Sequence, residues 1–252
     1  MNPAVSILIP VFNNPADTKV CLDGILASTN ANRTPFKIIV CDDGSDDATT
    51  VGYLEALGDR IQLLRNGQNL GYTRSANRLL AAADTPYAVL MNNDCIVHDD
   101  WLDPLVDRLT SDPGVALVGT RARFGRGADG KPTPVMVMFE CVGINLGAAR
   151  KLGGFDEIFA PAYYEDDDYN VRALLGGYRI DVIADPKVAH ENPGRSYGAV
   201  RRLALMKINA RKFIEKWGDH PQVALYIRYV LFNPHTWKSG FSADDIAQLP
   251  GG

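Results

Sequence analysis

Five short polar motifs of this 252-residue chain carry the side chains that could do chemistry. In chain order they are Cys41–Asp46, Asn69–Asn77, Asn92–Asp94, Glu165–Asp168 and His190. The first motif is an acidic turn, in which Asp42 and Asp43 could accept hydrogen bonds from a base N–H or a ribose hydroxyl. Aspartate and serine also favour turns and helix caps, and taken alone this motif favours a cap.

The second motif is a glycine turn that leads into a predicted helix. The N-terminus of a helix offers free N–H groups and a positive dipole to an anion. Arg74 adds a cation that could reach a phosphate. An exposed arginine at the start of a helix is nevertheless the simpler interpretation of this motif alone.

The third motif, Asn92-Asn93-Asp94, follows an apolar segment. A diphosphate brought close to Asp94 would need a divalent cation to offset its charge. Mg²⁺ and Mn²⁺ take oxygen ligands, commonly one or two carboxylates together with phosphates. A polar turn explains the motif equally well when it is considered alone.

The last two motifs are the acidic cluster Glu165–Asp168 and His190. A carboxylate crowded by like charges has a raised pKa, which suits a general base, and acidic residues also favour helix N-termini. Both roles can coexist, with Asp166 serving chemistry and Asp167 and Asp168 serving the helix. His190 could join Asp94 at a metal only if the fold brings the two together.

Predicted strands and helices alternate over the first 120 residues. The predicted strands are Val5–Pro10, Phe36–Cys41, Ile61–Leu64, Tyr87–Met91 and Val115–Gly119. The predicted helices are Asp17–Ser28, Asp47–Leu57, Arg74–Ala83 and Trp101–Ser111. Apolar strands alternating with helices indicate a parallel sheet covered on both faces, with ligands beyond the carboxyl ends of the strands. The acidic and glycine turns fall at that edge.

The alternation ends near Arg121. The segments that follow are predicted as a loop (Arg123–Pro134), strand and turn (Val135–Leu146), short helix (Arg150–Gly154), helix (Asp166–Gly176), strand (Tyr178–Ala184), long helix with a basic face (Ser196–Trp217) and helix (Val223–Leu231). We therefore predict one α/β domain over residues 1–218 and a C-terminal helical extension and tail over residues 219–252.

Composition narrows the class of protein. The net charge of −4 argues against a nucleic-acid surface. The four cysteines form no CxxC pair, which argues against a zinc knuckle and indicates reduced core cysteines. The sequence shows neither a signal peptide nor an apolar run of about 20 residues, so we expect a cytoplasmic protein whose contact with any membrane is peripheral.

Taken together, the motifs resemble those of glycosyltransferase family 2, which are inverting enzymes with the GT-A fold. The matching segments are VSILIPVFNN (Val5–Asn14), VCDDGSDD (Val40–Asp47), NLGYTRSAN (Asn69–Asn77), VLMNNDCIV (Val89–Val97), GGFDEIF (Gly153–Phe159), YYEDDDYNVR (Tyr163–Arg172) and EKWG (Glu215–Gly218). The resemblance covers most of the chain. It implies an α/β, Rossmann-like fold with a mostly parallel central sheet flanked by helices.

The resemblance also implies a role for each matching residue. On the nucleotide side, the implied residues are Pro10 and Phe12 lining the nucleoside pocket, Asp42 and Asp43 bonding the base or ribose, and Arg74 and Asn77 holding the nucleotide. Asn92-Asn93-Asp94 takes the place of the family's DxD motif, with Asp94 as the metal-binding carboxylate.

His190 matches a residue that completes the metal shell in some members of the family. Asp166 matches the general base, with Glu165 beside it. The segment Val142–Leu146 would face the sugar or the acceptor.

The resemblance finally implies an activity. A single sugar would pass with inversion from a nucleoside-diphosphate donor, a UDP- or dTDP-sugar, to a glycan or lipid-linked glycan, with Mn²⁺ or Mg²⁺ as cofactor. The expected pathway is bacterial surface polysaccharide synthesis, and the long C-terminal helices could pair two chains as a homodimer.

Other classes of protein fit the sequence less well. A nucleotidyltransferase usually has a glycine-rich basic loop where this chain has Pro10–Asn14, and a dinucleotide dehydrogenase would need GxGxxG there. A non-catalytic nucleotide-sugar-binding relative is the remaining alternative, against which the intact acidic cluster argues.

Overall fold

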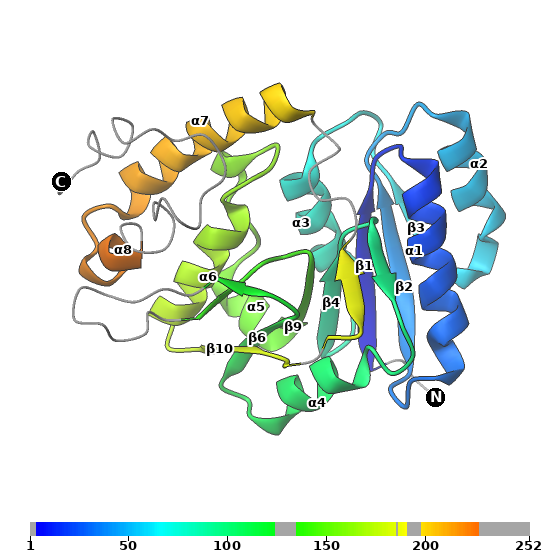
Figure 1. The fold of residues 1–252 in the computed structure, drawn as a ribbon, viewed down its shortest axis with the longest axis horizontal. Helices are drawn as coiled ribbons and strands as arrows, with labels where there is room; N and C mark the ends of the chain where they lie inside the picture. Colours follow the sequence, from blue (N-terminus) through cyan, green and yellow to red (C-terminus); the bar gives the residue numbers. More distant parts are fainter. Residues whose placement is uncertain (1–3, 124–134, 185, 191–197, 227–252) are drawn as a thin grey trace.

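A seven-stranded sheet forms the centre of the molecule (Figure 1). The structure is a computed structural model that describes residues 4–123, 135–184, 186–190 and 198–226. The strand order is β10-β6-β9-β4-β1-β2-β3. The strands are β1 (Val5–Val11), β2 (Phe36–Asp42), β3 (Gln62–Arg65), β4 (Tyr87–Met91), β6 (Val115–Gly119), β9 (Cys141–Asn145) and β10 (Arg179–Val182). Only β9 runs antiparallel to its neighbours, so the predicted mostly parallel sheet is confirmed.

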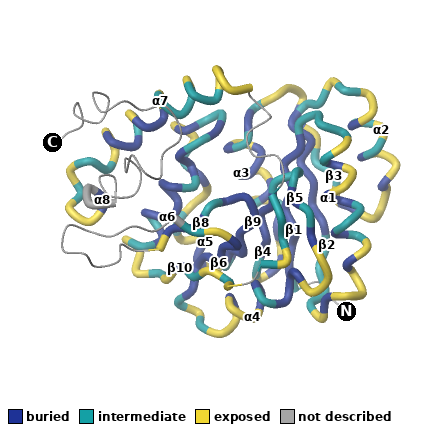
Figure 2. The backbone as a smooth tube through the Cα atoms, in the orientation of Figure 1, coloured by how far each residue is buried: buried dark blue, intermediate teal, exposed yellow. Residues whose placement is uncertain are grey.

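Helices cover both faces of this sheet. They are α1 (Pro15–Ala27), α2 (Ala48–Ala56), α3 (Tyr72–Ala82), α4 (Asp103–Ser111), α5 (Leu146–Leu152), α6 (Glu165–Leu175), α7 (Ala199–Trp217) and α8 (Pro221–Tyr226), with 3-10 turns η1 (Ser28–Asn30), η2 (Gly58–Arg60) and η3 (Glu157–Phe159). Alternate side chains of β1 enter two separate cores: Ile7 and Ile9 pack with residues of α1 and α4, and Leu8 packs with residues of α3 and α6. The central strands are therefore apolar at successive positions. Figure 2 shows that β1 and β4 are buried along most of their length.

A small antiparallel sheet extends the fold where the sequence predicted no strands. Strand β5 (Cys95–Val97) pairs with β11 (Val188–His190), and His190 lies opposite Cys95. A second antiparallel pair joins β7 (Ala122–Arg123) to β8 (Met136–Val137), and β8 lies within the segment Val135–Leu146 that was predicted as strand and turn. Strands of two or three residues carry too little periodicity to be recognised from sequence.

The segment Val142–Leu146, which the resemblance placed against the sugar or acceptor, lies elsewhere. Most of it belongs to β9, between β4 and β6, and the side chains of Val142 and Ile144 are buried in the core. The following helix starts at Leu146, earlier than predicted, because Asn145 Oδ1 accepts hydrogen bonds from the Gly147 and Ala148 amides.

The C-terminal part of the described chain packs as a third core. Ala210, Phe213 and Ile214 of α7 pack with Phe159 and Tyr164. Most of the predicted loop Arg123–Pro134 and the last part of the predicted helix Val223–Leu231 lie outside the described residues. Within the described ranges, none of the helices combines the length and the apolar character that crossing a bilayer requires.

Candidate functional site

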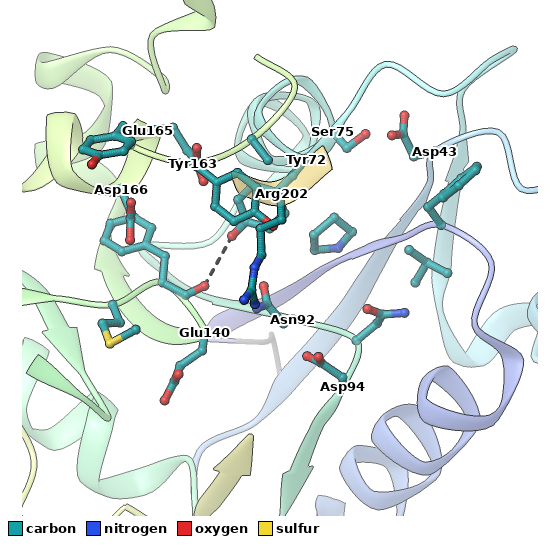
Figure 3. Close-up of a pocket in the computed structure, with 18 of the residues that line it drawn as sticks. Asp43, Tyr72, Ser75, Asn92, Asp94, Glu140, Tyr163, Glu165, Asp166 and Arg202 are labelled. Carbon is teal, nitrogen blue, oxygen red and sulfur yellow. Dashed lines mark hydrogen bonds between the residues drawn. The ribbon is translucent and has the colours of Figure 1, made fainter. Parts of the chain in front are cut away.

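A cavity of about 710 Å³ opens beyond the carboxyl ends of β1 and β4. Most of the predicted site residues line it: Pro10, Phe12, Asp43, Asn92, Asn93, Asp94, Glu165, Asp166 and His190. Figure 3 shows Asp94 and Asp166 on opposite sides of the cavity, with Arg202 pointing into the space between them. Segments far apart in the chain thus meet at one edge of the sheet, as parallel topology requires.

His190 lies beside Asp94 because β11 pairs with β5. Its Nε2 atom is 2.8 Å from Asp94 Oδ1, and its Nδ1 atom is 3.1 Å from Glu140 Oε2. Arg121 Nη1 in turn donates to Glu140 Oε2 at 2.9 Å. Burial alone would lower the pKa of His190, but hydrogen bonds and charges from Asp94 and Glu140 outweigh it and raise this pKa to about 9. In the absence of a metal, the imidazole therefore holds a proton at neutral pH.

The same residues fit a divalent cation. One ligand atom each from Asp94, Cys95 and His190 lie within 4.8 Å of one another. A carboxylate oxygen and an imidazole nitrogen are suitable ligands, whereas burial raises the pKa of the Cys95 thiol well above its usual value and keeps it protonated. Glu140 takes the outer position typical of a carboxylate that orients a metal-binding histidine. Its backbone oxygen also accepts hydrogen bonds from Asn92 N and Cys95 Sγ.

The acidic cluster divides between the cavity and the interior. Glu165, Asp166 and Asp167 line the cavity. Asp168 is fully buried and accepts hydrogen bonds from Arg172 Nε at 2.8 Å and Trp217 Nε1 at 2.9 Å. Of the two residues assigned to the helix, Asp168 thus bonds within the fold, whereas Asp167 also lines the cavity.

Glu165 is a buried carboxyl group at the N-terminus of α6. Its Oε2 atom has no hydrogen-bond partner among the described residues. Burial first, and the negative charge of Asp166 second, raise the pKa of Glu165 well above its usual range. Two carboxyl groups with different surroundings can divide the acid and base roles, because the buried one keeps its proton.

At the opposite end of the cavity, Asp43 organises the glycine turn. Its Oδ1 accepts from Asn66 Nδ2 at 2.7 Å and Leu70 N at 2.9 Å, and its Oδ2 accepts from Gly71 N at 2.8 Å. Gly71 has φ +88°, and a Cβ there would lie 2.4 Å from Pro161 Cβ, so only glycine fits. Asp43 therefore shapes the wall next to Pro10 and Phe12.

Three residues implied to bind the nucleotide do not line the cavity. Asp42 is fully buried, where its Oδ2 pairs with Arg65 Nε at 2.9 Å. Arg74 Nε pairs with Glu157 at 3.0 Å, and Asn77 Oδ1 accepts from Phe155 N at 2.6 Å. Helical spacing explains why positions 74 and 77 lie away from the cavity.

Tyr72 and Ser75, three residues apart on α3, share the face that borders the cavity. Arg74 and Asn77 share the neighbouring face of α3. Their side chains form hydrogen bonds with Glu157 and with Phe155 O, in and next to η3. The direct hydrogen bonds expected of Asp42, Arg74 and Asn77 with a nucleotide therefore have no support in this geometry.

Sequence reasoning missed several residues that line the cavity, including Glu140, Tyr72, Arg201 and Arg202. The Tyr72 hydroxyl donates to Phe139 O at 3.3 Å, and burial raises its pKa well above 10. The only sequence feature that pointed to Arg201 and Arg202 was the basic face predicted for the long C-terminal helix. Helical periodicity alone does not tell which residues of that face reach a distant cavity.

Comparisons with known proteins identify the class to which this fold and site belong. A model of the family "Glycosyl transferase family 2" matches residues 6–168, so the chain belongs to that family. It is 27% identical over 124 residues to glycosyltransferase AglE of Haloferax volcanii, with 48% of this chain and 40% of that protein covered.

The chain is also 32% identical over 98 residues to the UDP-Glc:alpha-D-GlcNAc-diphosphoundecaprenol beta-1,3-glucosyltransferase WfgD of Escherichia coli, with 39% and 36% covered. The matched stretches thus span less than half the length of these relatives. Among solved structures, the mannosyltransferase PcManGT from Pyrobaculum calidifontis, in complex with GDP-Man and Mn²⁺, superposes with a TM-score of 0.66 at 20% identity. That match covers 85% of this chain and 65% of the other, and it shows the shared GT-A fold.

Proposed function

We propose that this protein transfers one sugar from a nucleoside-diphosphate donor to an acceptor hydroxyl, with inversion and with a divalent cation. The observation that carries the proposal is one cavity bordered by Asp94 and His190 on one side and by Asp166 on the other. The solved mannosyltransferase that shares the fold binds GDP-Man and Mn²⁺, which supports a nucleotide sugar and a metal here as well. The name of the Escherichia coli relative supports a UDP-sugar donor.

The donor side of the cavity would bind the nucleotide and the cation. Asp94 and His190 would hold Mn²⁺ or Mg²⁺, and Glu140 keeps the imidazole in place. When bound, the cation neutralises the charge that grows on the departing nucleotide. Arg202 points into the same space and would place a positive charge near the diphosphate.

The nucleoside would occupy the end of the cavity bordered by Pro10, Phe12 and Asp43. Asn92 and Asn93 also line the cavity, and their amides would be available to donor hydroxyls. Asn93 Nδ2 is tied to Thr18 Oγ1 at 2.8 Å, which fixes the amide for such a contact.

Asp166 would act as the general base. It takes the proton of the acceptor hydroxyl while the acceptor oxygen forms its bond to the anomeric carbon and the bond from that carbon to the diphosphate breaks. Attack from the face opposite the leaving group inverts the configuration. Glu165, whose raised pKa keeps it protonated, remains neutral beside the base and does not compete for the proton.

The acceptor would be a glycan or a lipid-linked glycan, as in bacterial surface polysaccharide synthesis. The relative from Escherichia coli, whose name specifies a diphosphoundecaprenol-linked sugar, supports this class of acceptor. A cytoplasmic location with peripheral membrane contact, and a homodimer formed by the C-terminal helices, remain expectations from the sequence.

The decisive experiment is a screen of the full chain against UDP-, dTDP- and GDP-sugars with Mn²⁺, with and without EDTA. We expect release of the nucleoside diphosphate from one donor class, abolished by EDTA, and NMR of the product should show the inverted anomer. Pyrophosphate release from a nucleoside triphosphate and a sugar phosphate would instead identify a nucleotidyltransferase. Nucleotide binding without any turnover would identify a non-catalytic relative.

A further inference from the structure

Asn209 is a buried amide on α7 that contacts the segment leading into the acidic cluster. Its side chain is 1% exposed. Its Nδ2 atom lies 2.6 Å from Phe159 O, 2.9 Å from Ala162 O and 3.0 Å from Tyr163 O. Three backbone carbonyls thus converge on one amide nitrogen, which has two N–H donors.

The turn next to these carbonyls adopts an unfavourable backbone conformation. Tyr163 has φ +78° and Tyr164 has φ +72°, in the left-handed region that side chains with a Cβ rarely adopt. Such a conformation is costly and persists only where the surroundings impose it. Tyr164 is the N-cap of α6 and makes no side-chain capping hydrogen bond. The turn must therefore be held by contacts from another element.

The helix that supplies this contact also reaches the cavity. Arg202 lies seven residues before Asn209, about two helical turns, so the two side chains share one face of α7. Arg202 points into the cavity (Figure 3). Further along α7, whose path Figure 1 shows, Asn209 contacts the turn that precedes Glu165 and Asp166. One rigid element thus connects the donor side of the cavity with the base.

We propose that Asn209 is a positioning residue for the general base. By fixing the carbonyls of Phe159, Ala162 and Tyr163, it holds the left-handed turn and so sets where the carboxyl groups at the start of α6 project into the cavity. The inference rests on the proposed glycosyl transfer, because a base needs positioning only if it takes a proton.

The alternative is that Asn209 merely attaches α7 to the domain. Other contacts already do this: Lys212 Nζ donates to Ile158 O at 2.6 Å, Lys216 Nζ pairs with Asp168 at 2.6 Å, and Phe213 is fully buried. These contacts persist when the amide alone is changed. Loss of the amide should therefore loosen the turn without releasing the helix.

The kinetic test compares Asn209→Asp and Asn209→Ala with Asn32→Ala. Asn209→Asp keeps the shape, removes both N–H donors and places a carboxyl group against three carbonyl oxygens. Asn32 is a matched control, since its buried amide donates to Ser28 O and accepts from Leu102 N and its side chain does not line the cavity. We expect both Asn209 variants to lower kcat by about 10- to 100-fold, because small displacements of a reacting group cost that much.

The KM for the donor found in the screen, and the Kd for UDP or GDP with Mn²⁺, should stay within about twofold of wild type, because the donor side of the cavity keeps its contacts. Asn32→Ala should lower the melting temperature without lowering kcat. A kcat within about twofold of wild type in both Asn209 variants would overturn the inference.

Hydrogen exchange of the full chain without ligand separates this inference from the proposed function. We expect faster amide exchange over residues 162–168 in both Asn209 variants than in wild type, with unchanged exchange in the central strands. If wild type turns over no nucleotide sugar, the proposed function fails while the exchange data still report on the turn. Unchanged amide protection of residues 162–168 in both variants would show that Asn209 does not hold the turn.

Discussion

The two sides of the cavity hold their charged groups in different ways. On the side that we call the metal edge (Asp94, Glu140 and His190), each side chain bonds the next at 2.8 to 3.1 Å, and paired strands supply the backbone. On the side that we call the base edge (Glu165 and Asp166), the carboxyl groups start a helix after two residues with positive φ. Glu165 there keeps one buried oxygen without a partner among the described residues.

This difference indicates what each edge does before substrate arrives. The metal edge is preorganised, because a protonated His190 joins Asp94 and Glu140 at the position that we propose for the cation. At the base edge, by contrast, Glu165 Oε2 is unpaired among the described residues, and Asn209 of α7 donates to the carbonyls of Ala162 and Tyr163 just before the helix. Buried polar groups without partners are costly, and such groups are often found at functional sites. We therefore expect changes at the base edge to affect turnover and changes at the metal edge to affect metal binding.

Asp166→Asn gives the largest expected effect and tests the base edge. Loss of general-base assistance should lower kcat by about 10²–10⁴, because the amide cannot accept the acceptor's proton. The Kd for Mn²⁺ and for a nucleoside diphosphate should change little, as measured by calorimetry. Asp156→Asn serves as the control, because Asp156, at the start of η3, pairs with Lys216 of α7 and does not line the cavity. Near-normal turnover of the Asp166→Asn variant would mean that another group is the base.

Glu140→Gln tests the metal edge. The amide keeps the size of the side chain but removes the charge that orients His190, and loss of such an outer carboxylate typically weakens metal binding by about 10–100-fold. Electron paramagnetic resonance of free Mn²⁺ measures this without any donor. At saturating Mn²⁺ we expect kcat to stay close to wild type.

Asp103→Asn is a matched control for Glu140→Gln. Asp103 is a buried carboxylate that accepts hydrogen bonds from Arg33 N and Thr34 N and does not line the cavity. Its substitution should cost stability and leave the Kd for Mn²⁺ unchanged. An equal loss of Mn²⁺ binding in both variants would attribute the Glu140 effect to general destabilisation.

The sequence predicted the sheet and most of the residues that meet at its edge. Apolar strands that alternate with helices define a parallel sheet, and β4 and β6 have the predicted bounds. The acidic turn and Asn92–Asp94 directly follow strands, so topology alone brings them to the cavity. His190 was harder to place, because its position depends on the three-residue pairing of β11 with β5.

Residues on helices were predicted less well than residues that end strands. A difference of one or two positions on a helix moves a side chain to another face, which is why Arg74 was expected at the cavity and Tyr72 was not. Arg202 reaches the cavity only through the packing of α7, and no local pattern encodes that packing. The orientation of the Glu140 side chain depends on Arg121 and His190, which are about 20 and 50 positions away in the sequence.

The pH dependence of Mn²⁺ affinity tests whether a proton occupies the metal edge. His190 has a pKa raised from 6.5 to about 9, so a cation that binds its Nε2 must displace the proton below that pH. We expect the Kd for Mn²⁺ to fall by about tenfold per pH unit from pH 7 towards pH 9 and then to level off. His190→Asn should bind Mn²⁺ weakly and without this slope. A flat profile in wild type would show that His190 is not a ligand.

The same proton links stability to pH when no metal is bound. Because the folded-state pKa lies above the unfolded value, the stabilisation is complete below about pH 6.5 and is lost as the pH rises through about 9. In EDTA, the free energy of unfolding of wild type should therefore decrease relative to that of His190→Asn over this range. Urea titrations at pH 6 and pH 9.5 measure the difference.

The smallest effect is expected at Arg74, which the sequence implicated in nucleotide binding. The Arg74 side chain is 47% exposed and pairs with Glu157 at 3.0 Å, and exposed pairs contribute about 0–1 kcal/mol. Arg74→Ala should therefore change the Kd for UDP or GDP with Mn²⁺ by less than about twofold. Arg202→Ala removes an arginine that points into the cavity and should weaken the same binding by about tenfold or more, since hydrogen bonds to charged groups contribute about 1.5–3 kcal/mol. Calorimetry on the two variants compares Arg202, which lines the cavity, with Arg74, which does not. The reverse order of effects would mean that the nucleotide lies against the face of α3 that carries Arg74, outside the cavity described above.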